Sequence, residues 1–375
     1  MPADAPARHL MHVFPSFGVG GPEVRFTTVA NRLGPKYRHT IVAMDGDFAC
    51  ADRLDPALRV ELVTVPARKG RALDPGNLMR FARVLHARRP DALITQNWGA
   101  VEWALAHRLW PVGRHLHFED GFGPEESDGR QLPRRVWMRR LALGRRTRVV
   151  VPSRTLERIA REQWRLAEPS VLYVPNGVDC ARFHPEAPRD PALAAVRRAC
   201  PGLLVGAVGS LRAEKNLGRL LRVIARLPGD PPVHAVIVGD GPERSGLERA
   251  AARLGLAGRV TFIGGHARPE ALLPWLDVFA LPSDTEQMPL SLLEAMAAGL
   301  PAVATDVGDV RAVVAAENHA FIVPRHDEAA FASRLAALLG DADGRRAVGR
   351  ANRLRAERHF AAESMVAAYD ALFVA

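Results

Sequence analysis

The chain has few cysteines and few aromatic residues. Its three cysteines, Cys50, Cys180 and Cys200, lie far apart, without the short spacing of a metal site or a redox pair. Aromatic residues make up 6% of the 375 residues, and the chain has neither a recognition-helix motif nor a row of stacking aromatics on a strand. These absences exclude a cysteine-based metal or redox centre and count against nucleic-acid binding.

Long apolar runs and a secretion signal are also missing. The longest apolar stretch, residues 290–304, is interrupted by Glu294, Gly299 and Pro301, so no membrane span is expected. The first residues, MPADAPARHLMHVF, lack the basic start, apolar run and cleavage site of a signal peptide. We therefore expect a globular protein of the cytoplasm.

Lysine is rare although the chain is basic. The net charge is +10, but the only lysines are Lys36, Lys69 and Lys215, and the other basic residues are arginines. An arginine-rich and alanine-rich composition is typical of coding bias, and basicity alone predicts only attraction to anions. A basic nucleic-acid-binding protein stays the alternative from another functional class. Lys215 stands out, because this chain seldom uses lysine.

Short runs of β-forming residues alternate with helical patterns, which is typical of parallel α/β layers. We expect strands at 9–16, 39–44, 60–66, 91–97, 114–120, 148–153, 203–210, 233–240, 259–265, 277–283, 301–306 and 320–324. Helices are expected between most of them. The predicted fold class is α/β, with two Rossmann-like, doubly wound parallel sheets rather than one sheet of a dozen strands.

The joint between the sheets is expected at residues 173–191, which are dense in Pro, Asn, Gly and Asp. This predicts an N-terminal domain over residues 1–172, a C-terminal domain over 173–355, and a terminal segment over 356–375 that contains a last apolar helix. Two such domains facing each other are expected to form a cleft at the carboxyl ends of both sheets.

The segment AVGSLRAEKNLGRLL, residues 207–221, runs from a strand through a short loop into a helix. Arg212 and Lys215 stand in the loop, beside an expected helix start with free N–H groups. This arrangement is typical of phosphate binding. Two solvated basic residues in a surface loop are an equally good interpretation.

Two glycine-rich turns follow other strands. Gly239 and Gly241, in VIVGDGPE, permit a close approach to a ligand, although such a turn more often only reverses the chain. Gly18, Gly20 and Gly21 follow the first strand but do not match G-x-G-x-x-G, which disfavours a nicotinamide cofactor. A glycine loop that covers a ligand and a loop that needs positive φ are both open interpretations.

The segment DTEQMPLSLLEAMAAGLP, residues 284–301, predicts a buried helix that begins at Pro289 and stops at Gly299. Ser291 and Glu294 are its polar exceptions and share one face. A helix with one surface acid is the simple interpretation. The surrounding apolar residues favour a carboxylate with a polar partner, because an unpaired buried charge is destabilising.

Glu286 precedes this helix, so two carboxylates flank its start. A glycosidase acid and nucleophile is one interpretation, which nothing else in the sequence supports. The other is recognition of sugar or ribose hydroxyls, since a carboxylate only accepts hydrogen bonds. The helix start at Met288, Pro289 and Leu290 would then hold an anion between Glu286 and Glu294.

Together these segments resemble the family 4 retaining glycosyltransferases of the GT-B fold. The resemblance rests on the E-x7-E motif of Glu286 and Glu294, which continues as LEAMAAGLPAVATDVG, and on the loops GSLRAEKN and VGDGPE in family order. VPNGVDCARF looks like the usual entry to the donor-binding domain, and the last helix resembles the one that crosses back onto the first domain. The match to the family is good over residues 171–324. In the N-terminal half of the chain, the match is limited to the glycine loop and the order of the strands.

The resemblance implies a role for each polar residue. Glu294 would bind the ribose of a nucleotide-diphosphate sugar, and Glu286 the hydroxyls of the transferred sugar. Arg212 and Lys215 would neutralise the diphosphate. Ser291 would belong to the same donor site.

The resemblance also implies backbone contacts and the chemistry. The turn Gly239–Gly241 would lie near the nucleotide, and Gly20 and Gly21 would close over the phosphates. Retention of configuration by front-face attack, with the departing phosphate taking the acceptor proton, is implied. No metal and no cofactor are expected beside the nucleotide-sugar substrate. Expected acceptors are glycans or lipid-linked glycans of bacterial cell-surface polysaccharide or glycolipid assembly. An epimerase or a phosphorylase on the same fold is the alternative.

The chain departs from the family pattern in the donor site. Gln287, Met288 and Pro289 stand where Gly-Phe-Gly often follows the first glutamate, and Pro289 removes one N–H donor. Ser210 stands where an arginine often begins its loop, with Arg212 two places later.

A third departure lies in the first domain. Many family members have a histidine after the fifth strand that contacts the sugar. This chain has HLHFEDGFGPEE there, which offers His117, Glu119 or Asp120. We rank Asp120 and Glu119 first for this contact.

Residues 130–148, RQLPRRVWMRRLALGRRTR, interleave basic and apolar side chains. Such a pattern is typical of a surface that lies on an anionic membrane, which would suit a lipid-linked acceptor and a peripheral position at the inner face of the cell membrane. A solvated basic face on a packed helix is at least as good an interpretation. The basic residues concerned are Arg134, Arg135, Arg139 and Arg140.

Overall fold

The computed structural model describes residues 7–67, 74–126, 131–200, 202–227 and 232–375. The chain divides into two compact units. Unit 1 comprises residues 1–121, 129–175 and 365–375, and unit 2 comprises residues 122–128 and 176–364. The predicted division placed the joint after residue 172 and assigned residues 356–364 to the terminal segment.

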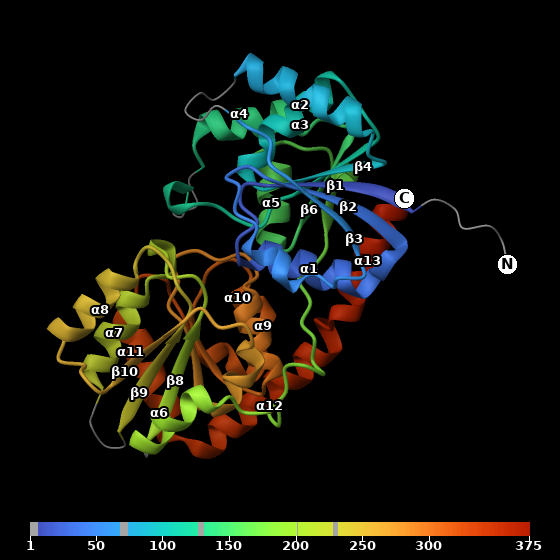
Figure 1. The fold of residues 1–375 in the computed structure, drawn as a ribbon. Helices are drawn as coiled ribbons and strands as arrows, with labels where there is room; N and C mark the ends of the chain where they lie inside the picture. The colour runs from blue at the N-terminus through green and yellow to red at the C-terminus, as the bar shows by residue number, and fades with distance from the viewer. Residues whose placement is uncertain (1–6, 68–73, 127–130, 201, 228–231) are drawn as a thin grey trace. The chain divides into compact units, whose positions relative to one another are not determined.

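Unit 1 is built on a parallel sheet, with seven strands in the described residues, in the order β3-β2-β1-β4-β5-β6-β7. The strands are β1 (Arg8–Phe14), β2 (Tyr37–Ala43), β3 (Arg59–Val63), β4 (Ala92–Gln96), β5 (Arg114–Phe118), β6 (Thr147–Val151) and β7 (Val171–Tyr173). The helices are α1 (Gly21–Leu33), α2 (Pro75–Arg88), α3 (Val101–Leu109), α4 (Pro133–Ala142), α5 (Arg154–Glu162) and α13 (Ala362–Val374). Helices α2 and α3 lie on one side of this sheet, and α1 and α13 on the other (Figure 1).

Alternation along β1 explains why helices cover both sides. Leu10 belongs to a cluster with Val29 of α1 and Phe373 of α13, whereas Met11 packs in a cluster with Trp103 of α3. A parallel strand that is buried on both faces is a continuous apolar run rather than an alternating one. The run LMHVF in β1 therefore requires two covering layers of helices.

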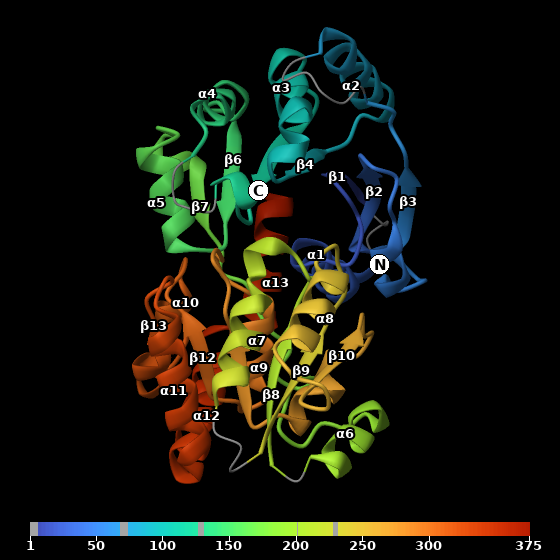
Figure 2. The same ribbon diagram turned by 90° about the vertical axis from the view of Figure 1, so that its left-hand side faces the viewer.

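Unit 2 repeats this design with six strands in the described residues, in the order β10-β9-β8-β11-β12-β13. The strands are β8 (Leu203–Val208), β9 (Val233–Val238), β10 (Val260–Gly264), β11 (Val278–Leu281), β12 (Ala302–Thr305) and β13 (Ile322–Val323). The helices are α6 (Ala194–Ala199), α7 (Leu217–Arg226), α8 (Arg244–Arg253), α9 (Leu290–Ala297), α10 (Val310–Val313), α11 (Glu328–Gly340) and α12 (Ala342–His359). Figure 2 gives the second view, with α7 and α8 in front of β8 and β9.

The predicted fold class is confirmed, since both sheets are parallel and doubly wound. Each of the twelve expected strands overlaps an observed one. Strand β7 was missed, because it has only three residues and runs directly into the Pro- and Gly-rich joint.

Both sheets reverse their strand order beside their first strand. In unit 1, β1 lies between β2 and β4, and in unit 2, β8 lies between β9 and β11. At such a switch point the following loops diverge to opposite faces and leave a crevice at the carboxyl edge, where α/β proteins bind ligands. In unit 2, the loops after β8 and β11 meet this condition.

Candidate functional site

A lysine and a glutamate meet at the switch point of unit 2. Lys215, from the loop after β8, places its Nζ 2.7 Å from Oε1 of Glu286, from the loop after β11. Ser283 Oγ donates to the same carboxylate oxygen at 2.8 Å. The Lys215 side chain is 24% exposed and that of Glu286 8%, so the pair lies at a partly shielded surface.

A small, half-open pocket lies beside this pair. Its wall includes Gly209, Ser210, Lys215 and Ser283, with apolar residues of β8 and β11 behind them. The structure therefore brings together the two motifs that carry Lys215 and Glu286, seventy-one positions apart in the sequence.

Arg212 lies in the same loop but reaches outward. Its side chain is 54% exposed, and its Nε stands 3.5 Å from Glu214 Oε1. The predicted free helix start beside it is wrong in part, because Asn216 caps α7 and accepts from the Arg219 N–H. Positive charge in this loop comes from the side chains of Arg212 and Lys215.

Helix α9 begins at Leu290, one residue later than predicted, and Pro289 is its N-cap residue. No side chain caps this helix start. Gly299, with φ 76°, follows the end of the helix, as expected for a stop. Glu294 and Ser291 are both half-buried.

Gly239 and Gly241 allow two loops to touch. A Cβ on Gly239 would lie 1.9 Å from the Gly209 carbonyl oxygen, and one on Gly241 would lie 2.5 Å from that of Leu211. Both glycines also have a positive φ. Their requirement for glycine is therefore explained by packing between the loops after β8 and β9.

In unit 1, the loop after β1 carries the glycines predicted to cover a ligand. Gly20 is the N-cap residue of α1 with φ −144°, and neither Gly18 nor Gly21 has a positive φ. The interpretation as a loop that needs positive φ is wrong. The prediction that Gly20 and Gly21 close over phosphates stays open.

Asp120, just after β5, forms a two-pronged ion pair with Arg25 of α1. Arg25 Nη2 lies 2.8 Å from Asp120 Oδ2, and Nη1 contacts Oδ1. The side chains are 4% and 12% exposed, and the guanidinium lies over the Phe118 and Tyr369 rings. Burial disfavours the charge on Arg25, but Asp120 outweighs it and raises the pKa of Arg25.

Glu119 and His117 are fully buried. Arg139 of α4 donates through Nε to Glu119 Oε2 at 3.0 Å, and His117 Nε2 stands 3.4 Å from the same oxygen. Burial opposes ionisation of Glu119, but Arg139 and His117 outweigh it and hold the pKa of the Glu119 carboxyl below its usual range. This geometry argues against Glu119 and His117 as sugar contacts and leaves Asp120.

Helix α4 contains the predicted basic surface, with one correction. Arg139 is fully buried, in contact with Glu119 and with its guanidinium 4.8 Å from the Trp164 ring centroid, so it is no part of a surface. Arg134 and Arg140 are exposed, and Trp137 is 56% exposed. Arg130, the first residue of the predicted stretch, lies outside the described residues.

The sequence pattern did not single out Arg25, Asp284 or Arg219, and it predicted a surface position for the buried Arg139. Arg25 offered a sign, because it is charged within the otherwise apolar face of α1 that contains Phe26 and Val29. Nothing in the sequence separates Arg139 from its three neighbouring arginines.

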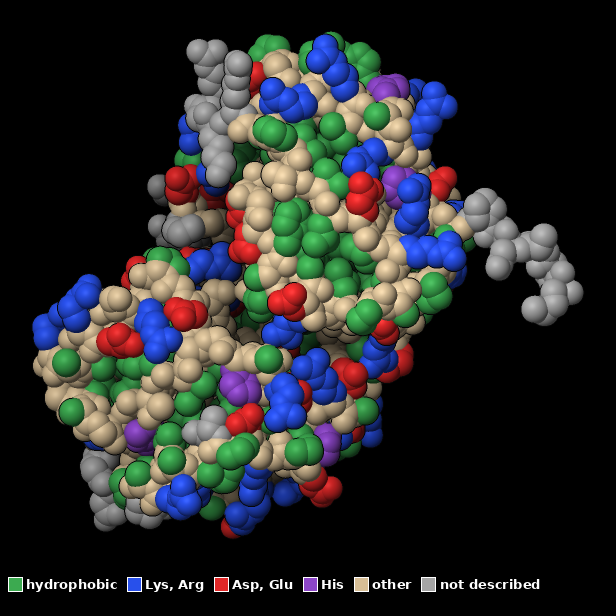
Figure 3. All heavy atoms as spheres, in the orientation of Figure 1, with side chains coloured by type: hydrophobic (Ala, Val, Ile, Leu, Met, Phe, Trp, Pro, Cys, Tyr) green, Lys and Arg blue, Asp and Glu red, His purple; other side chains and the backbone are tan. Residues whose placement is uncertain are grey.

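The surface charge does not gather into one stripe on the face drawn in Figure 3, where basic and acidic side chains are interspersed. Such mixing differs from the continuous basic footprint of a nucleic-acid-binding face. In the described ranges, no helix combines the length and apolar content of a membrane span. No group of three or more metal-binding side chains occurs in that part of the chain.

Comparison with known proteins decides the family. Residues 19–182 match the model of Glycosyltransferase Family 4, and residues 201–355 match that of Glycosyl transferases group 1. The D-inositol 3-phosphate glycosyltransferase of Corynebacterium urealyticum is 30% identical over 294 residues, which cover 72% of this chain and 68% of that protein. The chain belongs to the family 4 glycosyltransferases.

A second relative aligns over a shorter segment. The D-inositol 3-phosphate glycosyltransferase of Nocardia farcinica is 35% identical over 216 residues, which cover 53% of this chain. The chain spans about half of the length of that relative, 47%. The structure of HepE from Anabaena in complex with UDP and glucose covers 98% of this chain and 99% of its own, with a TM-score of 0.82 at 19% identity. That similarity shows the fold.

Proposed function

We propose that this protein moves a sugar from a nucleotide-diphosphate sugar to an acceptor, with retention of configuration. The observation that carries this proposal is the Lys215–Glu286 contact at the switch point of unit 2, next to a pocket. A cation for a diphosphate and an acceptor-only carboxylate for sugar hydroxyls stand side by side there. The family and the names of the relatives favour transfer of the sugar to an acceptor rather than hydrolysis of a sugar bond.

The proposed roles follow from position and charge. Lys215 and Arg212 bind the diphosphate, and the uncapped start of α9 at Met288, Pro289 and Leu290 adds partial positive charge. Glu286 holds the hydroxyls of the transferred sugar. Glu294, with Ser291 on the same face of α9, binds the ribose.

The remaining roles rest on the resemblance to the family. The Gly239–Gly241 turn lies near the nucleotide, and Gly20 and Gly21 close over the phosphates. Asp120 contacts the sugar, with Arg25 holding its carboxylate in one orientation. No cofactor is part of the proposal.

Leaving-group stabilisation is the main task of such a site. The bond between the anomeric carbon and the phosphate oxygen breaks, and the acceptor oxygen bonds to the same face of that carbon. The acceptor proton passes to the departing diphosphate oxygen, so the donor itself supplies the base. Lys215 and Arg212 stabilise the charge that develops, and removal of one such donor group lowers kcat on the order of 100-fold.

The acceptor is proposed to be a glycan or a lipid-linked glycan of bacterial cell-surface polysaccharide or glycolipid assembly. Helix α4 supports this choice, because Arg134, Trp137 and Arg140 expose an amphipathic basic surface suited to an anionic membrane. We propose that the protein acts in the cytoplasm, at the inner face of the cell membrane.

Two substitutions test the donor site after a thermal-shift screen with UDP-, GDP- and ADP-sugars has found the nucleotide. Glu294→Ala should weaken nucleotide binding by about tenfold or more, since the ribose hydroxyls lose a charged acceptor. Glu286→Ala should lower kcat on the order of 100-fold and change nucleotide binding much less.

Controls for this test separate the finer claims. Glu248→Ala, an exposed acid of unit 2 that pairs with Arg244 of its own helix, should leave both measurements unchanged. Activity that survives excess chelator supports metal independence, and product NMR reports the anomeric configuration. Wild-type turnover in both glutamate variants would contradict the assignment, and sugar interconversion without acceptor would indicate an epimerase.

A further inference from the structure

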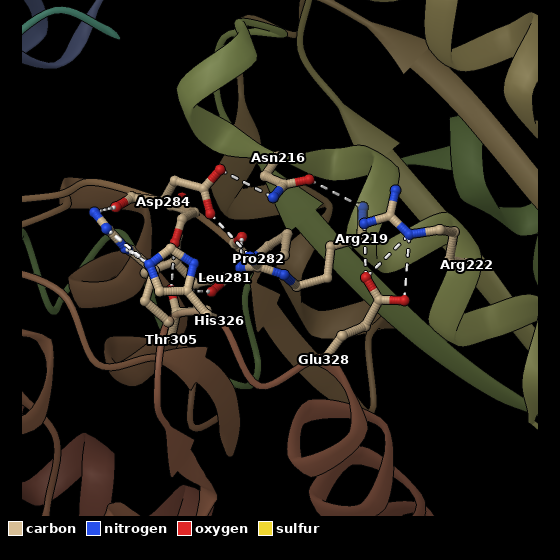
Figure 4. A network of polar contacts seen from close by, with 11 residues as sticks. Asn216, Arg219, Arg222, Leu281, Pro282, Asp284, Thr305, His326 and Glu328 are labelled. Carbon is tan, nitrogen blue, oxygen red and sulfur yellow. Dashed lines mark hydrogen bonds and ion pairs between the residues drawn. The ribbon is translucent and has the colours of Figure 1, made fainter. Parts of the chain in front are cut away.

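Asp284 uses every polar group it has. Its Oδ1 accepts from Arg219 Nη2 at 2.9 Å, and its Oδ2 accepts from Asn216 Nδ2 at 3.0 Å. Its N–H donates to the Glu214 carbonyl at 2.8 Å, and its carbonyl accepts from Arg325 Nη1 at 3.3 Å. Figure 4 shows the Asp284 carboxylate facing Asn216 and Arg219, with its contacts drawn as dashed lines.

These contacts close a ring between the two loops that carry Lys215 and Glu286, beside the proposed diphosphate site. Asn216 directly follows Lys215, and Asp284 stands two positions before Glu286. The Asn216–Asp284 hydrogen bond and the Lys215–Glu286 ion pair thus join the same two loops at adjacent points. A shift of one loop against the other strains both contacts together.

The backbone conformation of Asn216 orients the loop that carries Lys215. Asn216 is left-handed, with φ 42° and ψ 46°, between the short turn Ala213–Lys215 and the start of α7. This conformation is uncommon for residues other than glycine and asparagine, and it turns the chain so that Lys215 lies beside Glu286. The amide of Asn216 is held at one end by Asp284 and at the other by the Arg219 N–H.

Arg219 anchors the ring to the sheet. It is 5% exposed, and its Nη1 donates to the Pro282 carbonyl at 2.7 Å, just after β11. A buried guanidinium needs a charged partner, and Asp284 is the carboxylate that Arg219 contacts. Arg219 therefore holds the Asp284 side chain in place, and Asp284 in turn holds the loop at Asn216.

We propose that Asp284 is a positioning residue that sets the geometry of the Lys215–Glu286 pair and so the affinity for the diphosphate part of the donor. This inference rests on the proposed function, since it takes Lys215 to be a diphosphate ligand. Asp284 acts through Asn216 and Arg219 and touches no substrate. Its effect therefore depends on the phosphates of the ligand.

A purely structural role makes a different prediction. Loss of stability lowers the fraction of folded protein, so it weakens the binding of a nucleoside and the binding of the nucleoside diphosphate by the same factor. Loss of a positioning contact weakens only the binding of the nucleoside diphosphate. The ratio of the two dissociation constants, measured by calorimetry with competition for the weak nucleoside, separates the two roles.

Asp284→Asn is the first variant, because the new amide cannot accept from both Arg219 and Asn216. We expect about tenfold weaker binding of the nucleoside diphosphate, with nucleoside binding within about twofold of wild type. In the Lys215→Ala background, Asp284→Asn should add less than about twofold, since contacts in one network are not additive.

Two further variants provide a second test of the contact and a matched control. Asn216→Gly retains the left-handed backbone and removes only the amide, so it should reproduce the effect if Asp284→Asn fails to fold. Glu248→Gln breaks the Arg244 ion pair of 2.9 Å on α8, which shares no residue with the ring, and it should leave the ratio unchanged.

The outcomes distinguish this inference from the proposed function. A wild-type protein that binds none of UDP, GDP and ADP overturns both. A wild-type protein that binds one of them, with an unchanged ratio in Asp284→Asn and Asn216→Gly, overturns only the role of Asp284. Equal weakening of nucleoside and diphosphate, or full additivity with Lys215→Ala, overturns it as well.

Discussion

At the scale of single residues, this protein places two ion pairs in the interior of unit 1, one after the other in the sequence. Glu119 pairs with Arg139, both without exposed surface, and the adjacent Asp120 pairs with Arg25. A buried pair adds little to stability as a whole, but the loss of one partner leaves an uncompensated charge. The two pairs tie α4 and α1 to the end of β5.

Glu119→Gln should destabilise the protein by about 3–5 kcal/mol, because Arg139 keeps its charge and loses its carboxylate. The free energy of unfolding in urea measures this. Glu162→Gln is the matched control, since Glu162 is 63% exposed and its pair with Arg158 should contribute less than about 1 kcal/mol. Equal small effects of the two substitutions would show that Arg139 does not depend on Glu119.

At the scale of elements, the sequence predicted the positions of the strands well. It predicted poorly which side chains of a helix are buried. The inner strands of both units contribute apolar residues to clusters on both faces of their sheets, a pattern that local sequence makes visible. In α4, by contrast, four arginines look alike in sequence, and packing turns Arg139 inward against Trp164 while Trp137 remains exposed. Which arginine is buried follows from the position of Glu119, a contact across twenty residues that no local pattern contains.

Helix α4 also carries a prediction about membranes. The double variant Arg134→Glu/Arg140→Glu should lose sedimentation with vesicles that contain anionic lipid, because about 1 kcal/mol per basic residue near the surface is lost and repulsion is added. Arg249→Glu/Arg253→Glu on α8 makes the same change of charge at exposed positions of unit 2. Equal sedimentation of the two double variants would remove α4 as the membrane-facing surface.

At the scale of the whole molecule, the two units differ in their buried histidines. In unit 1, His9, His12, His39, His107 and His115 all have a lowered pKa, in each case first because burial disfavours the charged ring. The pKa of His39 falls to about 4. In unit 2, His234 has a pKa lowered for the same reason.

Unit 1 should therefore be the more acid-sensitive unit. Between pH 6.5 and about 4 the unfolded chain binds protons that the folded chain does not, so stability present above pH 6.5 is lost as the pH falls. Hydrogen exchange at pH 7.5 and 5.0, corrected for intrinsic rates, should show protection falling more in unit 1. His39→Gln should reduce the fall by about 2 kcal/mol. An equal fall in both units would contradict this prediction.

The sequence by itself determined the strand pattern, the fold class and the family motifs, because apolar runs, glycine turns and short spacings are local properties. It also singled out Lys215 and Glu286, since each is an exception within its own segment. Only the tertiary structure decided which groups meet. Lys215 contacts Glu286, and Glu119 forms a buried ion pair with Arg139. Asp284 joins the two loops after β8 and β11 through Asn216. The contacts of Lys215 and Asp284 follow from strand order at the switch point of unit 2, where segments far apart in the chain become neighbours in space. The Glu119–Arg139 contact follows from the packing of α4 near the end of β5.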